Sequence, residues 1–498
     1  MAHVLLLITL RRIRSVGETA LCARGIHCVV VSTTPTNGFR TSYESRDFVT
    51  KAFVVVGTVY HTPTPDALEV LRNVVIAVGA DGRISAIHDA DAKTAGELVS
   101  SSEVVVRLGT SERLLPGLID THIHAPQWPQ LGTGLDISLD KWLFEYTFPL
   151  EVKYADAGFA HEVWHQMVPT MLRHGTTTAV YYSSIHSKAT TMLAETCIEY
   201  GQRAFVGRVA MDHPTGTPDW YRDESAASGI EDSAASIVAI QELSGAKGLV
   251  EPIITPRFLP ACTDELLQGL GYLAEHTGVR VQTHCSESDW EHGYALDRFG
   301  ASDTEMLQKF GLIRQNSVLA HADHVSDSDL AIMHNAQAGV AHCPLSNAYF
   351  ANAVFPLQRA MKAGVSVGLG SDVAGGPHVG LLPQCGHAVT ASRYLEDGVD
   401  AQLSSNRRGV PHSRVDIVTA FHVATAGGAQ LLGIDAGTIA VGKIFDAFVV
   451  NVDRSETGLH NYEGIDNDER LFEKIVRLAG PSDITAVWVS GRTVHSTR

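Results

Sequence analysis

The 498-residue sequence lacks the features that would place a protein in a membrane, outside the cell or on nucleic acid. It has no run of 18 or more apolar residues, so we expect no membrane span. It has no Asn-x-Ser/Thr glycosylation site, which favours the inside of the cell. The formal net charge is −17 and no block of basic residues occurs, so we expect no nucleic-acid or anionic-membrane partner. Together these absences predict a cytoplasmic protein.

Cysteine is scarce, and several cysteine- and glycine-based motifs are missing. The seven cysteines are Cys22, Cys28, Cys197, Cys262, Cys285, Cys343 and Cys385. Their number is odd and no two are spaced as Cys-x-x-Cys, so we expect a reducing compartment and no cysteine-bound zinc. The chain also lacks the phosphate loop Gly-x-x-x-x-Gly-Lys-Ser/Thr. It lacks the Pro-Cys-x-x-Cys of the cytidine-deaminase type, which excludes that class of zinc deaminase.

The residues that are present divide the chain into a terminal extension and two predicted domains. Residues 1–50 contain a short apolar run, then arginines and few acids, so we expect a disordered extension or, alternatively, a mitochondrial targeting segment. Residues 51–113 and 437–498 both contain short β-type runs separated by turn signals. They predict one small β-sandwich domain formed from both ends of the chain. Residues 114–436 between them form the predicted catalytic domain.

The middle region alternates short apolar strands with segments of helical periodicity, which is the pattern of repeated βα units. The predicted strands are 115–122, 176–182, 204–210, 249–255, 279–284, 317–321, 339–342 and 366–369. Eight such units predict an α/β fold, a TIM-like (β/α)8 barrel. In that fold the chemistry lies at the carboxyl ends of the strands.

Polar side chains follow the ends of several predicted strands. His122 and His124 close the first strand and, being two residues apart, point to the same side of an extended chain. The fifth strand ends at His284, and Asp372 comes soon after the eighth. Imidazole nitrogens and carboxylate oxygens are zinc ligands. We therefore predict that His122, His124, His284 and Asp372 bind one zinc ion.

Three strand-end residues are candidates for catalysis by such a metal ion. A bound zinc ion lowers the pKa of its water to about 7. Asp372 could accept a proton from that water, and His321, at the end of the sixth strand, could orient it. Glu287 lies three residues beyond His284 and could carry protons to the attacked atom and the leaving group. The alternatives are a buried structural histidine at 321 and a surface carboxylate at 287.

The order of these motifs resembles the amidohydrolase superfamily and, within it, the branch that deaminates guanine. The resemblance covers residues 53–498 and is carried by segments 116–127, 132–136, 146–149, 201–207, 255–258, 341–344 and 368–376. It implies a homodimer that hydrolyses guanine to xanthine and ammonia, with the activated water attacking carbon 2 of the purine. It also implies zinc on the four ligands, with Glu287 as proton shuttle and His321 beside the water. Iron in place of zinc stays open.

The same resemblance implies which residues bind the purine. Gln127 and Arg257 would hydrogen-bond its edge and Phe258 would line the base pocket, with Trp128 where the family has Tyr or Phe. Arg257 stands where two-metal members bring a bridging ligand, and arginine cannot ligate a metal, so one metal ion is expected. Arg257 could instead pair with a barrel carboxylate. Two further hypotheses stay open: another heterocyclic substrate (a pterin, a triazine or a cytosine-like ring), and a non-enzymatic scaffold.

Overall fold

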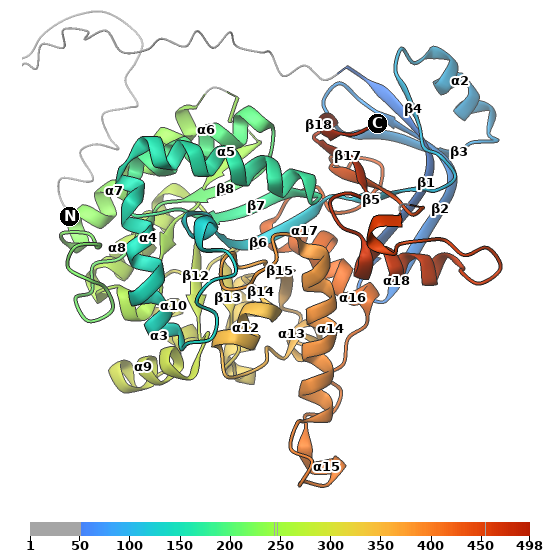
Figure 1. Cartoon of the computed structure of the whole chain (residues 1–498). Coiled ribbons are helices and arrows are strands. Elements are labelled where there is room, and N and C mark those ends of the chain that lie inside the picture. Colours follow the sequence, from blue (N-terminus) through green and yellow to red (C-terminus); the bar gives the residue numbers. More distant parts are fainter. Residues whose placement is uncertain (1–50, 244, 247, 454) are drawn as a thin grey trace, which may run out of the picture. The chain divides into compact units, whose positions relative to one another are not determined.

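The structure is a computed structural model, and it describes residues 51–243, 245, 246, 248–453 and 455–498. The predicted N-terminal extension, residues 1–50, lies outside the described residues. Within the described ranges, no helix has the length and apolar character needed to cross a membrane. The two main sheets of this part are a parallel barrel and a second, mixed sheet (Figure 1).

Eight parallel strands form the wall of the barrel. In the order of their hydrogen-bonded neighbours they are β10 (Val250–Pro252), β8 (Arg203–Gly207), β7 (Thr176–Tyr182), β6 (Leu118–His124), β15 (Ser366–Leu369), β14 (Gly339–His342), β13 (Val318–His321) and β12 (Gln282–Cys285). Two short strands, β9 (Val209–Ala210) and β11 (Thr255–Pro256), continue β8 and β10. A parallel bridge between Ile254 and Val281 joins the two ends of this order, so the ring closes. The predicted (β/α)8 barrel is confirmed.

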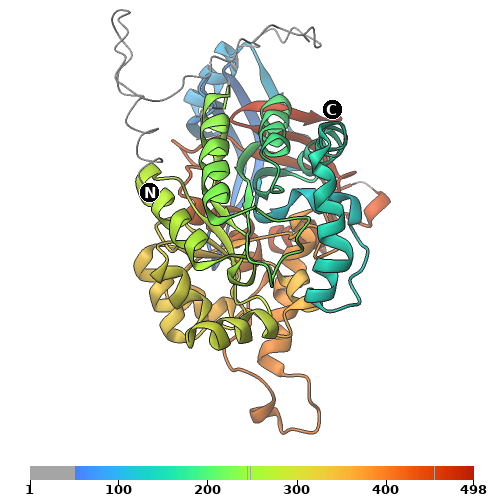
Figure 2. The same ribbon diagram turned by 90° about the vertical axis from the view of Figure 1, so that its left-hand side faces the viewer.

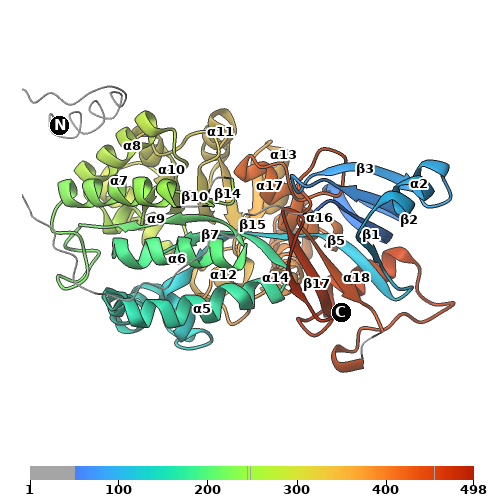
Figure 3. The ribbon, with the colours of Figure 1, turned by 90° about the horizontal axis from the view of Figure 1, so that it is seen from above.

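Helices connect successive strands and cover the outside of the barrel (Figures 2 and 3). The main ones are α5 (Ala157–Arg173), α6 (Ser187–Tyr200), α7 (Ala226–Glu242), α8 (Asp264–Thr277), α9 (Asp289–Phe299), α10 (Asp303–Lys309), α11 (Asp327–Ala336), α12 (Pro344–Phe350), α13 (Leu357–Lys362) and α14 (Leu381–Asp397). The Thr263 side chain caps α8 by accepting from the backbone N–H of Leu266. Such caps satisfy backbone donors that a helix start leaves unpaired.

The second sheet is built from both ends of the described chain. Its order is β18 (Arg492–Ser496), β17 (Ile484–Val489), β16 (Ala447–Asn451), β5 (Glu112–Pro116), β1 (Phe53–Thr64), β2 (Ala67–Val78) and β3 (Ile84–Asp89), with β4 (Val105–Arg107) beside β1. The turn after β2 meets the turn after β17, because Gly82 lies against the backbone of Ser490. The sheet therefore curls around its own apolar core, which includes Phe445 and Trp488. The sequence predicts a small β-sandwich domain from both ends of the chain, and the structure has one curled sheet there.

One segment connects the two sheets and leads into the site. The predicted strand 115–122 is in fact two strands, β5 in the curled sheet and β6 in the barrel, separated by Gly117. The predicted domain boundary at residue 113 falls inside β5. A Cβ atom at Gly117 would lie 2.1 Å from Oγ1 of Thr177, so the chain can pass this point only without a side chain. The β5 register with β16 thus helps to fix where β6 begins.

Candidate active site

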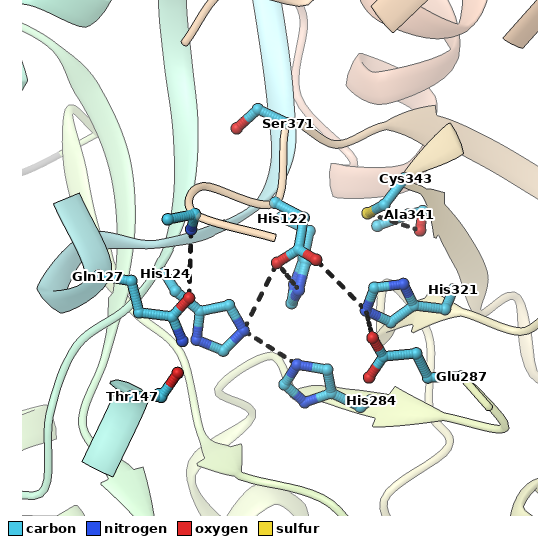
Figure 4. Close-up of polar contacts among 12 residues, drawn as sticks. His122, His124, Gln127, Thr147, His284, Glu287, His321, Ala341, Cys343 and Ser371 are labelled. Atoms are coloured by element: carbon cyan, nitrogen blue, oxygen red, sulfur yellow. Dashed lines mark hydrogen bonds and ion pairs between the residues drawn. The ribbon is translucent and has the colours of Figure 1, made fainter. Parts of the chain in front are cut away.

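The carboxyl ends of three barrel strands bring the four predicted metal ligands together (Figure 4). His122 and His124 come from β6, His284 comes from β12, and Asp372 follows β15. All four are buried. Nε2 of His124 lies 2.9 Å from Nε2 of His284, and Oδ1 of Asp372 lies 3.2 Å from Nε2 of His122 and 3.7 Å from Nε2 of His124. The four side chains converge on one point.

The electrostatics of this cluster favour the protonation states that a metal ion requires. Burial, followed by the charge of His122, holds the pKa of His124 and of His284 well below the usual value, so both imidazoles are neutral. Burial raises the pKa of Asp372, but the neighbouring imidazoles, His122 first, lower it more, and it stays well below its ordinary value. A neutral imidazole and an ionised carboxylate are the forms that bind metal.

Hydrogen bonds set which imidazole nitrogen faces the cluster. Nδ1–H of His284 donates to the backbone oxygen of Arg257 at 2.6 Å. Nδ1–H of His321 donates to Oδ1 of Asn347 at 2.8 Å, and Nδ2 of Asn347 donates in turn to Oδ1 of Asp323 at 2.7 Å. A carbonyl oxygen only accepts, so each ring carries its hydrogen on Nδ1 and presents a bare Nε2 to the site.

Three buried imidazole nitrogens in and beside the cluster lack hydrogen-bond partners. Neither ring nitrogen of His122 makes a hydrogen bond, although Nε2 approaches Asp372, and Nε2 of His321 makes none. Buried polar atoms without partners are costly. A divalent cation among His122, His124, His284 and Asp372 would satisfy the converging lone pairs. Three nitrogen donors and one carboxylate are a suitable set for a catalytic zinc ion.

Close packing of the backbone holds the side chains at the metal site in place. Asp372 (φ 47°) and His321 (φ 69°) adopt left-handed backbone conformations, which are uncommon for residues with a side chain and occur at functional sites. The backbone N–H of Asp372 donates to the oxygen of His122 at 3.0 Å. At Gly370 an added Cβ would lie 2.7 Å from Sγ of Cys343 and 2.9 Å from Cβ of His122. The absence of a side chain at residue 370 lets β15 approach β6.

Glu287 lies beside the predicted ligands. It follows β12 and is buried, and its Oε1 lies 3.8 Å from Nε2 of His321. Burial, and after it the charge of Asp372, raises the pKa of Glu287 to about 8. A carboxyl group with this pKa carries a proton at neutral pH and can donate it or take it back. Glu287 thus lies next to the predicted metal ligands, and its role as proton shuttle stays a prediction.

The cluster forms one wall of a pocket. The pocket is lined by His124, Gln127, Leu139, Trp142, Leu143, Arg257, Phe258, His284, Glu287, Phe350, Asp372 and Gly375. Three of the four predicted substrate residues are therefore in this lining. The fourth, Trp128, is not among them; it packs against the apolar core that includes Trp164 and Met167. Its position does not support the predicted contact with substrate, because the 3-10 helix Ala125–Gln130 directs consecutive residues to different sides.

The guanidinium of Arg257 is paired with a buried carboxylate, as one of the two hypotheses for this residue predicts. Its two terminal nitrogens donate to Oε2 and Oε1 of Glu151 at 2.6 and 3.2 Å. Arg257 also lines the pocket, so the two hypotheses do not exclude each other. Burial lowers the pKa of Arg257, but the Glu151 carboxylate raises it more, and the net shift is upward. The arginine is a permanent cation at the pocket wall.

Sequence reasoning missed the part of the wall that comes from loops and short helices. Trp142 and Leu139 come from α3 (Leu139–Trp142), and Phe350 ends α12. The rings of Trp142 and Phe350 contact each other with centroids 5.2 Å apart. Glu151, the last residue of α4 (Phe148–Glu151), was missed as well. Segment 146–149 signals the neighbourhood, but nothing in the local pattern marks Glu151 as buried.

A (β/α)8 barrel whose strand ends bring three imidazoles and a carboxylate together defines the class of metal-dependent hydrolases. Residues 113–494 match the sequence model of the amidohydrolase family. The chain belongs to the amidohydrolase family.

Two relatives and one solved structure illustrate this membership. The probable guanine deaminase of Schizosaccharomyces pombe is 35% identical over 450 residues, which cover 89% of this chain and 83% of that protein. The guanine deaminase of Dictyostelium discoideum is 32% identical over 455 residues, covering 88% of this chain and 97% of that protein. A crystal structure of guanine deaminase from C. acetobutylicum with bound guanine is similar with a TM-score of 0.79 and 26% identity; the match covers 89% of this chain and 100% of that one.

Proposed function

We propose that this protein hydrolyses guanine to xanthine and ammonia. The observation that carries the proposal is one pocket that combines two sets of groups. The convergent ligands His124, His284 and Asp372 line it together with the hydrogen-bonding residues Gln127 and Arg257. Relatives that are 35% and 32% identical over most of the chain are named probable guanine deaminase and guanine deaminase, which supports this substrate.

The metal of this site is proposed to be zinc, one ion per chain, with iron as the alternative. His122, His124, His284 and Asp372 would hold it, because they are the convergent nitrogen and oxygen donors of the pocket. When bound, such an ion lowers the pKa of a water molecule towards neutrality and so supplies a nucleophile. The fork of Arg257 cannot serve as a ligand, which argues for a single ion.

The chain's own residues account for recognition of a flat purine ring. Arg257 and Gln127 offer N–H donors to acceptor atoms on the purine edge, and the buried ring of Phe258 gives an apolar surface for the ring face. Trp290 packs against Phe258 with ring centroids 5.7 Å apart and so holds that surface in place. A few polar groups in an otherwise apolar pocket fix the orientation of a ligand.

Glu287 supplies the proton transfers. With its pKa raised to about 8, it holds a proton at neutral pH and can donate it to the ring nitrogen next to carbon 2, which makes that carbon electrophilic. The Glu287 carboxylate that remains takes a proton from the attacking water and transfers it to the departing amino group, which leaves as ammonia. The water oxygen becomes the new carbonyl oxygen at carbon 2, and its second proton restores the Glu287 carboxyl group. The overall change is guanine plus water to xanthine plus ammonia.

A direct assay tests the proposal. Purified protein with its metal content measured is incubated with guanine, and xanthine and ammonia are both quantified. A pterin, an aminotriazine and cytosine are run in parallel, because other heterocycles are the alternative substrates. We expect one xanthine and one ammonia per guanine consumed. Absence of both products with zinc-loaded protein overturns the proposal. If another heterocycle is turned over faster than guanine, that heterocycle is the substrate and guanine is not.

Two further features stay predictions. The homodimer rests on the resemblance to the guanine-deaminating branch, and sedimentation of the purified protein measures it. The cytoplasmic location rests on composition, and it is checked by microscopy of a tagged full-length chain.

A further inference from the structure

The carboxylate of Glu151 is fully buried behind the pocket wall and accepts four hydrogen bonds. Oε2 accepts from Arg257 at 2.6 Å and from the hydroxyl of Tyr221 at 3.0 Å. Oε1 accepts from Arg257 at 3.2 Å and from Nε2 of Gln127 at 3.2 Å. Glu151 therefore contacts both of the polar residues that we expect to meet the purine edge, and it does not line the pocket itself.

These contacts determine how the side-chain amide of Gln127 is turned. A carboxylate only accepts, so the amide nitrogen must face Glu151. The amide oxygen accepts from the backbone N–H of Ala374 at 3.1 Å. If the Gln127 amide were flipped, its oxygen would face the Glu151 carboxylate and its N–H groups would face the backbone N–H of Ala374, and neither pair could form a hydrogen bond. Gln127 is thus locked with one amide hydrogen left over for a ligand.

The same carboxylate determines the direction of the Arg257 fork. One hydrogen from each terminal nitrogen is committed to Glu151, and the guanidinium lies 4.9 Å from the ring centroid of Phe148. The remaining N–H groups are donors, and the cation has no acceptor. Its charge is balanced inside the protein, so the ligand need not be an anion.

The following inference rests on the proposed function. We propose that Glu151 is a positioning residue: it orients Gln127 and Arg257 so that this wall of the pocket presents only hydrogen-bond donors. The wall then selects purines with an oxygen at position 6 over purines with an amino group there. The carbonyl oxygen at purine position 6 has two lone pairs and can accept hydrogen bonds from both Gln127 and Arg257. An amino group at that position would place its own N–H donors against theirs. A site with buried groups that match one hydrogen-bonding pattern rejects the opposite pattern strongly.

The test compares guanine with 2,6-diaminopurine, which carries the same 2-amino leaving group but an amino group at position 6. In Glu151→Gln only one acceptor oxygen remains at residue 151, so the side chain can no longer hold the donors of both Gln127 and Arg257 in their wild-type directions. We expect the ratio of kcat/KM for guanine to that for 2,6-diaminopurine to fall about ten- to hundredfold, the equivalent of one charged hydrogen bond. We expect most of the loss for guanine to appear in KM. A residue that only stabilises the fold would lower both substrates alike and leave the ratio unchanged.

Asp446→Asn is the matched control. Asp446 is a buried carboxylate paired with Arg203, Nε to Oδ2 at 3.2 Å, and Ser490 also donates to it. None of these residues lines the pocket. The control therefore removes the same charge from a buried ion pair and should keep the wild-type ratio. If Glu151→Gln does not fold, Tyr221→Phe removes one donor to Glu151 and should lower the ratio by a smaller factor.

Binding measurements separate this inference from the proposed function. Hypoxanthine and adenine differ at position 6 and lack the 2-amino group, so calorimetric dissociation constants report the preference without turnover. Wild-type protein should bind hypoxanthine more tightly, and Glu151→Gln should reduce that preference about ten- to hundredfold. An unchanged preference in a folded Glu151→Gln variant overturns the inference even if guanine is deaminated. A wild type that prefers hypoxanthine but leaves guanine intact supports the inference and overturns the proposed reaction.

Discussion

Replacing Gly370 with alanine would add one methyl group between two barrel strands at the metal site. That methyl would lie 2.7 Å from Sγ of Cys343 and 2.9 Å from Cβ of His122, which is well inside contact distance. The backbone of Gly370 cannot move away freely, because its N–H donates to the oxygen of His342 at 2.8 Å. Either His122 or the strand that carries it must therefore shift by several tenths of an ångström.

The expected cost has a structural and a metal-binding component. Overpacking of a filled core costs about 1–3 kcal/mol of unfolding free energy. Displacement of a metal ligand from its supporting contacts lowers metal affinity about ten- to hundredfold. We expect Gly370→Ala to show both effects, the first by urea unfolding of the metal-free protein and the second by competition for zinc with a chromophoric chelator.

Gly386→Ala is the control for this experiment. Gly386 lies within α14, and an added Cβ meets nothing within 4 Å. Alanine is favoured over glycine inside a helix by about 0.5–1 kcal/mol, so this variant should be slightly more stable and bind zinc normally. Wild-type zinc affinity and wild-type stability in Gly370→Ala would refute the packing argument.

Three further predictions concern proton transfer, metal and pH. Glu287→Gln should lower kcat for guanine by about two to four decades, the size of a general acid-base contribution, with unchanged zinc content; near-normal turnover would remove Glu287 from the mechanism. Chelation should abolish activity and lower the melting temperature, and zinc should restore both, because ligand binding stabilises the folded state; an unchanged melting temperature would contradict a resident ion. Burial raises the pKa of Asp303 to about 7, so its contribution to stability is fully present below pH 3.8 and is lost as the pH rises through 7. Between pH 4 and pH 8, urea titrations should therefore show a smaller decrease in unfolding free energy for Asp303→Asn than for wild type. An equal decrease in both proteins would show that the Asp303 carboxyl group does not cause the pH dependence.

The barrel strands could be predicted because each is a short apolar run that is visible in the local sequence. The metal ligands could be predicted because all barrel strands end at the same face. Strands such as 176–182 and 339–342 have the predicted bounds, since a short apolar run between turn signals has few other solutions. Parallel strands of a barrel end at the same face, so His122, His284 and Asp372 meet although they are far apart in sequence.

The remaining features depend on tertiary contacts that leave no local mark. The division of 115–122 into β5 and β6 depends on pairing with β16 on one side and β7 on the other. Glu151 lies beside a helix-like apolar segment, and its sequence is compatible with an exposed acid as well as with a buried one. Trp128 follows Gln127 directly, yet the 3-10 helix places it outside the pocket, whereas Trp142 enters it from a separate short helix.

The pairing of β5 with β16 also has a consequence for synthesis of the chain. Residues 112–116 lead directly into the strand that carries His122 and His124, but their partner strand is residues 447–451, near the end of the sequence. While the ribosome works through the barrel, β5 has an open edge on this side, and open strand edges are sites of misassembly. Strand β5, which leads into the first strand of the metal site, can therefore pair with β16 only after residues 447–451 have been made. Loss of residues 447–451 would therefore remove the partner of β5 and disturb the alignment of His122 and His124, which are more than 300 residues earlier in the sequence.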